Sequence, residues 1–79
     1  MTESEIFDQI KDIIFDIKDE IPVTIETALI EGGIMDSLEL INYLTQIEEA
    51  FGLNISMDLL IDKKLGIVAN LVKYIKEIV

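Results

Sequence analysis

A short motif near the middle of the chain holds the residues best placed to do chemistry. Residues 32–38 read Gly-Gly-Ile-Met-Asp-Ser-Leu and lead into a strongly periodic helical pattern. Asp36 and Glu39 are three residues apart, which is the spacing of a helix N-cap and its reciprocal partner in a capping box. This spacing places Ser37 in the first helical turn with its hydroxyl free. A serine at a helix N-terminus, where backbone N–H groups favour an anion, is well placed to carry a phosphate-linked group.

Most of the side chains that support catalysis are missing from this sequence. The chain has no His, Cys, Arg or Trp, so the usual general base, thiol nucleophile and bidentate phosphate clamp are all absent. Any serine nucleophile would need a lysine or a carboxylate as its base. The composition therefore predicts that the protein is not an enzyme and that no metal site forms, and that another enzyme would have to modify Ser37.

Length and hydropathy predict one folded domain over residues 1–79. Half of the residues are hydrophobic (51%), which opposes disorder. No apolar run approaches the length of a membrane span, and the acidic N-terminal residues do not resemble a signal peptide. The absence of cysteine removes disulfides from consideration. These features predict a cytoplasmic protein.

The charge distribution is strongly asymmetric. The net charge is −10, and residues 19–62 hold ten acidic residues and no basic one. Electrostatic repulsion excludes nucleic acid and anionic membranes as partners, whereas basic protein surfaces are favoured. The alternative is a solvated acidic surface that only aids solubility.

Hydrophobic periodicity predicts an all-α fold, a small bundle of three long helices and one short helix. The predicted helices span residues 3–19, 37–51, 56–61 and 65–78. Residues 20–35, which include Pro22, are predicted to be an irregular segment whose apolar anchors lie against the core, namely Ile21, Val23, Ile25, Leu29 and Ile30. Phe15 points away from the apolar stripe of the first helix and is predicted to be covered by a loop, the alternative being a minor contact site.

The helix predicted at residues 37–51 has two apolar faces. At 100° per residue one face is the predicted core face, formed by Leu40, Tyr43, Leu44, Ile47 and Phe51. Leu38 and Ile41 fall outside this face, next to Ser37 and among acidic residues. Two apolar residues rimmed by carboxylates predict a small docking patch.

The motif in its context resembles that of the acyl carrier proteins, in the superfamily that also contains peptidyl and D-alanyl carriers. The shared features are the glycine-rich lead-in, Asp-Ser-Leu, the acidic second helix ending Ile-Glu-Glu-Ala-Phe, and a length of about eighty residues. The resemblance implies that Ser37, with Asp36 beside it, carries 4′-phosphopantetheine, whose thiol holds cargo as a thioester. It also implies partner contacts at Leu38, Glu39, Ile41, Glu48 and Glu49.

The partners implied by the resemblance are a phosphopantetheinyl transferase and loading ligases or synthases with basic docking surfaces. The protein itself is expected to be a free-standing monomer that serves fatty acid or polyketide biosynthesis. Four features depart from the fatty-acid type: Asn42, Thr45, the apolar run Leu59-Leu60-Ile61, and the two residues that separate Gly33 from Asp36. This spacing is closer to that of D-alanyl carriers, so a D-alanyl, aminoacyl or peptidyl cargo stays open.

Two further functions remain as alternatives. The first is an unmodified acidic adaptor that binds a basic protein without using Ser37. The second is a cation-binding helical protein using Asp58 and Asp62, although the chain lacks the acid–glycine loop of an EF-hand.

Overall fold

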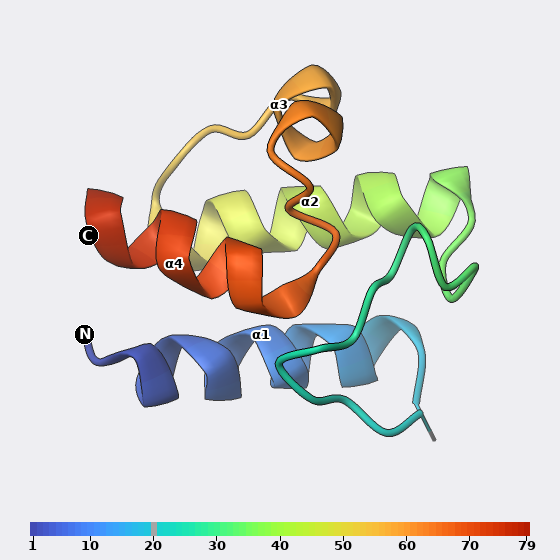
Figure 1. Cartoon of the computed structure of the whole chain (residues 1–79), viewed down its shortest axis with the longest axis horizontal. Coiled ribbons are helices and arrows are strands. Elements are labelled where there is room, and N and C mark those ends of the chain that lie inside the picture. The colour runs from blue at the N-terminus through green and yellow to red at the C-terminus, as the bar shows by residue number, and fades with distance from the viewer. Residues whose placement is uncertain (20) are drawn as a thin grey trace.

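Four helices in the order α1 (Glu3–Ile17), α2 (Ser37–Phe51), α3 (Met57–Asp62) and α4 (Val68–Ile78) make up the fold (Figure 1). They are seen in a computed structural model that describes residues 1–19 and 21–79. α1 packs against both α2 and α4, and the short α3 lies in the connection between α2 and α4. The prediction of an all-α fold with three long helices and one short helix is confirmed. None of the helices in the described ranges is long and apolar enough to cross a bilayer.

Apolar stripes from the three long helices meet in one core. α1 contributes Ile6, Ile10 and Ile14, which are fully buried. The buried face of α2 is the one predicted from the periodicity, formed by Leu40, Tyr43, Leu44, Ile47 and Phe51. The core therefore fixes how α2 is rotated about its axis, and so which residues at its N-terminus face solvent.

The ends of three helices differ from the prediction, those of α3 by one residue each (Met57–Asp62). α1 ends at Ile17, two residues earlier than predicted, because Lys18 has the extended backbone conformation. α4 begins at Val68 rather than at residue 65. Lys64 has a positive φ of 52°, and Ile67 is extended and forms an isolated antiparallel bridge with Ala28, so the chain is not helical before Val68.

The irregular segment before α2 is joined to the start of α4 through backbone hydrogen bonds. The N–H of Leu29 donates to the carbonyl of Gly66 (2.9 Å), and the N–H of Val68 donates to the carbonyl of Thr27 (2.9 Å). Ala69 N–H donates in turn to a carbonyl of the same segment, that of Ile25, at 2.8 Å. α4 has no side-chain cap. The carbonyls of Thr27 and Ile25 instead accept hydrogen bonds from N–H groups that a helix start otherwise leaves unpaired.

The apolar anchors of this segment were predicted only in part. Val23 and Leu29 are buried, as predicted, and Ile21 is half-buried. The prediction was wrong for Ile25 and Ile30, which are 55% and 37% exposed. The backbone bonds to α4 hold the segment in place, so these two side chains are not needed as anchors. Glu20, at the start of the predicted segment, lies outside the described residues.

The predicted cover over Phe15 is also absent from the described part of the chain. Its side chain is 39% exposed, and the Lys11 ammonium lies 5.7 Å from the ring centroid. A cation–π contact with Lys11 therefore stands in place of the predicted loop, and the ring stays partly exposed.

Candidate functional site

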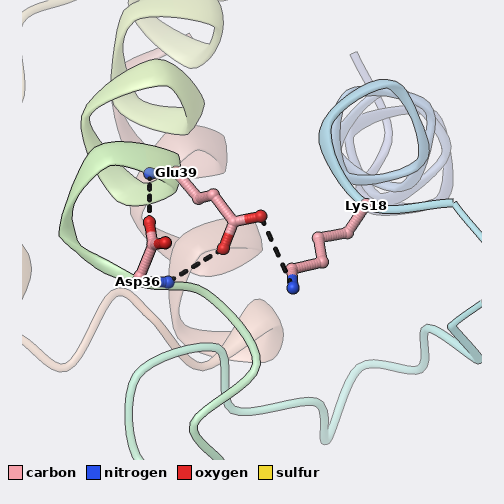
Figure 2. A network of polar contacts seen from close by, with 3 residues as sticks. All are labelled: Lys18, Asp36 and Glu39. Atoms are coloured by element: carbon pink, nitrogen blue, oxygen red, sulfur yellow. Dashed lines mark hydrogen bonds and ion pairs between the residues drawn. The ribbon is translucent and has the colours of Figure 1, made fainter.

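Ser37 is the first residue of α2 and is exposed to solvent. The capping box predicted from the sequence is present (Figure 2): the N–H of Glu39 donates to Oδ1 of Asp36 at 2.8 Å, and the N–H of Asp36 donates to Oε1 of Glu39 at 3.0 Å. Neither bond uses the Ser37 hydroxyl. The motif therefore presents Ser37 at a rigid helix start while leaving its oxygen available to react.

The backbone around Ser37 favours a negatively charged substituent. Leu40 is the first residue of α2 whose N–H donates within the helix, to the carbonyl of Asp36 at 2.9 Å, and Glu39 donates to the cap. The N–H groups of Ser37 and Leu38 come before these bonds, in the part of a helix that has no intrahelical acceptor. These two N–H groups and the helix dipole both favour a negatively charged phosphate on Ser37. The residues present therefore fit a cofactor attached through a phosphodiester.

The lead-in to α2 is folded back on itself by the Leu29 carbonyl. That oxygen accepts hydrogen bonds from the N–H groups of Ile34 (3.1 Å) and Met35 (3.2 Å). Gly33 has φ +64°, a left-handed conformation in which glycine carries little steric cost. Met35 is buried, whereas Asp36 next to it is exposed. The turn therefore anchors the chain one residue before the cap and sets the position of Ser37.

Glu39, which was predicted to contact partner proteins, also makes two contacts within the molecule through its carboxylate. Its Oε2 lies 3.5 Å from Nζ of Lys18, which follows α1, while its other oxygen serves the capping box (Figure 2). Its side chain in this pair is 26% exposed. A partly exposed ion pair of this kind contributes at most about 1 kcal/mol. Its geometry joins the site end of α2 to the end of α1, and so positions Ser37.

The apolar docking patch predicted on α2 is exposed. Leu38 is 78% exposed and Ile41 is 53% exposed, far more than the residues of the core face. The sequence reasoning missed a third apolar side chain, Ile61 on α3, which is 59% exposed. It lines a small hollow of about 80 Å³ together with Ile30 of the irregular segment. The run of apolar residues at Leu59, Leu60 and Ile61 was the available signal, since a short helix can bury only one of its faces.

The two acidic residues predicted as partner contacts near the end of α2 have different environments. Glu49 is exposed. Glu48 is half-buried, and its Oε2 accepts a hydrogen bond of 2.8 Å from the N–H of Ile55 in the link to α3. Glu48 therefore fixes this link in addition to any contact with a partner.

The structure brings no metal-binding cluster together in the ranges 1–19 and 21–79, where no group of three His, Cys, Asp or Glu could hold an ion. Asp58 and Asp62, which form the cation-binding alternative, are both exposed on α3.

Comparison with known proteins gives one match at the level of a family. The family model described as "Phosphopantetheine attachment site" matches residues 8–75, most of the chain. The matched range includes the whole of α2, with Ser37 at its start. No solved structure matches the chain.

Proposed function

The chain belongs to the phosphopantetheine-attachment-site family, and on this premise we propose that it is an acyl carrier protein whose cofactor is attached to Ser37. The family match confirms the resemblance of the Asp-Ser-Leu motif and its context to carrier proteins. Proteins of this family carry a covalently bound 4′-phosphopantetheine, and carrier domains are generally not catalysts themselves.

The observation that carries the proposal is the placement of Ser37. Its side chain is exposed at the start of α2, beside N–H groups that precede the first hydrogen bonds of the helix. Three serines occur in the chain, and the other two are set differently. Ser56 uses its hydroxyl to cap α3 through the N–H of Leu59 (3.1 Å). Ser4 is the second residue of α1, not the first, and has a glutamate on each side, Glu3 and Glu5.

Electrostatics at this site require a covalent link to the cofactor. The dipole of α2 stabilises a phosphate on Ser37 by about 0.3–1 kcal/mol. The neighbouring Asp36 carboxylate opposes it by a similar amount, about 1 kcal/mol for unit charges in contact in water. Because the two effects nearly cancel, the site cannot retain the group by affinity alone. The pantetheine thiol, once attached, supplies the sulfur that holds an acyl group as a thioester.

We propose that partner enzymes bind the exposed apolar residues beside Ser37. Carrier domains in general interact with phosphopantetheinyl transferases and with synthases. In this chain Leu38 and Ile41 offer exposed apolar area, and the exposed carboxylate of Glu49 lies on the same helix. A basic surface with an apolar centre is the complement of this patch, and its attraction should weaken as salt is added. Ile61 on α3 extends the apolar area available to such partners.

The second candidate function is that of a D-alanyl or aminoacyl carrier. The composition of the exposed face of α2 supports this candidate. Asn42 and Thr45 are both exposed and uncharged, where the fatty-acid carriers that the chain resembles have an acid and a larger apolar residue. A basic fatty-acid synthase surface would therefore gain less from this face. Loading of the modified protein by a D-alanine ligase but not by a fatty acyl ligase would assign the cargo to this second class.

The test of attachment is the intact mass of the protein after co-expression with a phosphopantetheinyl transferase. We expect one phosphopantetheine adduct on the wild type and on Ser4→Ala, and none on Ser37→Ala. Ser4 is the matched control because it also lies in the first turn of a helix that begins with a capping box. An adduct that persists in Ser37→Ala, or no adduct on any of the three proteins, would refute the assignment. The unmodified adaptor would then remain.

A further inference from the structure

Glu39 is the one acid of residues 19–62 that has a cation beside it in the described part of the chain. Those residues hold ten acids and no base. The ion pair within 4.0 Å among the described residues joins Oε2 of Glu39 to Nζ of Lys18, at 3.5 Å. Its cation comes from outside the acidic segment, at the end of α1. Glu39 therefore differs from the other described acids as a target for a basic protein.

Both oxygens of the Glu39 carboxylate are engaged within the molecule (Figure 2). Oε1 accepts the hydrogen bond of 3.0 Å from the N–H of Asp36 in the capping box, and Oε2 faces the ammonium of Lys18. The glutamate side chain is 26% exposed, so little of it is open to a third group. A cation that approaches Glu39 therefore meets a carboxylate whose charge is already balanced, and the Lys18 ammonium repels it.

The end of α1 holds Lys18 in place for this pair. The N–H of Lys18 donates to the carbonyl of Ile14 at 2.7 Å, which fixes its backbone at the C-terminus of the helix. A positive charge is favoured there by the helix dipole, and the last turn of α1 contains no other base. Because the lysine side chain is 39% exposed, its ammonium can leave Glu39 for water at modest cost.

We propose, on the premise that the chain is a carrier protein, that Lys18 competes with basic partner enzymes for Glu39. A partner gains this carboxylate only by displacing the ammonium, so it exchanges one ion pair for another. Lys18 thereby lowers the affinity of α2 for each partner that presents a cation to Glu39. A partner that docks on Leu38 and Ile41 alone is unaffected, so Lys18 also helps to determine which partners bind tightly.

Such competition suits a protein that transfers cargo between enzymes. Affinity differences among related complexes lie mostly in the dissociation rate, so the exchange of ion pairs speeds the release of the carrier from each partner. When the partner leaves, Lys18 pairs again with Glu39, and the junction between α1 and the start of α2 is restored.

The experiment measures KM and kcat of a phosphopantetheinyl transferase for variants of the unmodified protein. Lys18→Gln should lower KM about threefold, because an exposed ion pair contributes a factor of about five at most. It should leave kcat unchanged, because Lys18 is engaged with Glu39 and not with the Ser37 hydroxyl. Lys18→Arg keeps the cation and should not lower KM. Lys11→Gln removes the same charge from α1, where the ammonium lies beside Phe15, and should change KM by less than about 1.5-fold.

Glu39→Gln completes a double-mutant cycle with Lys18→Gln. Glutamine keeps an oxygen that can accept the N–H of Asp36, so the capping box is retained while the charge is lost. In this background Lys18→Gln should leave KM within about 1.5-fold, because there is no carboxylate left to compete for. High salt should shrink the difference between the wild type and Lys18→Gln. Circular dichroism verifies that each variant is folded.

The outcomes separate failure of this proposal from failure of the carrier assignment. If the wild type is modified but Lys18→Gln leaves KM unchanged or raises it, the competition is refuted while attachment at Ser37 stands. The same holds if Lys11→Gln lowers KM as much as Lys18→Gln, or if the effect of Lys18→Gln persists in the Glu39→Gln background. If the transferase modifies none of these proteins, the carrier assignment fails, and the competition for Glu39 fails with it.

Discussion

Replacing Tyr43 by phenylalanine should stabilise the protein. Tyr43 is fully buried on the core face of α2, and its hydroxyl has no hydrogen-bond partner among the described residues. An unpaired hydroxyl in a core costs about 1–3 kcal/mol, and phenylalanine removes it while keeping the ring. We therefore expect Tyr43→Phe to raise the free energy of unfolding by about 1–3 kcal/mol. For a domain of this size, each kcal/mol raises Tm by about 4–8 °C.

The assay is thermal and urea unfolding followed by circular dichroism at neutral pH. Tyr74→Phe is the matched control, because Tyr74 is half-exposed on α4, and it should change the stability by less than about 0.5 kcal/mol. A Tyr43→Phe variant that is less stable than the wild type would refute the reasoning. Such a result would mean that the hydroxyl is paired in solution, for example by a buried water.

Alkaline pH gives an independent check on the same residue. Burial raises the pKa of Tyr43 above its ordinary value, because desolvation disfavours the phenolate. The neutral phenol is thus favoured in the folded state, and its contribution is fully present below the unfolded pKa of about 10. Above that pH the unfolded chain ionises and the folded one does not, so stability falls by about 1.4 kcal/mol per pH unit. Tyr43→Phe should lose this contribution to the decline, as measured by urea unfolding at about pH 9 to 11.

Three further predictions concern the site and the segment that leads to it. Asp36→Ala should destabilise the protein by about 1 kcal/mol through loss of the cap, measured by urea unfolding, whereas Asp36→Asn should retain most of the stability. Gly66→Ala should destabilise the protein by about 1–3 kcal/mol, because a Cβ there would lie 2.9 Å from Cγ1 of Ile30. Adding Ile30→Ala to this variant should recover part of the lost stability. If the double variant recovers none, the packing of Ile30 against Gly66 is contradicted. Leu38→Ala should raise the KM of a phosphopantetheinyl transferase for the protein while shifting the unfolding free energy by less than about 0.5 kcal/mol; an unchanged KM would remove Leu38 from the proposed docking patch.

Features set by neighbouring residues were predicted well from the sequence. The bounds of α2, its capping box and its buried face agree with the prediction, because caps and amphipathic stripes depend on residues three or four apart. Gly52 ends the helix in the left-handed conformation, which glycine adopts at little steric cost. The position of Ser37 follows from the same local rules.

Features that depend on distant parts of the chain were missed. The late start of α4 results from backbone bonds to residues 25–29, and backbone bonds leave no pattern in the side chains. The exposure of Ile25 and Ile30 has the same origin. The pairing of Glu39 with Lys18 requires the end of α1 to lie beside the start of α2. This arrangement depends on tertiary packing and cannot be predicted from hydrophobic periodicity. A hollow of about 250 Å³ whose lining includes Phe7 of α1 and Ala69 of α4 forms only once these two helices pack together.

Mapping the modification directly is the sharpest test of the central claim, that Ser37 carries the cofactor. The protein modified by a phosphopantetheinyl transferase would be cleaved and its peptides fragmented in a mass spectrometer. We expect the whole phosphopantetheine mass on Ser37, in the peptide that contains the start of α2. Modification of Ser4 or Ser56 in its place, or peptides that are all unmodified, would contradict it.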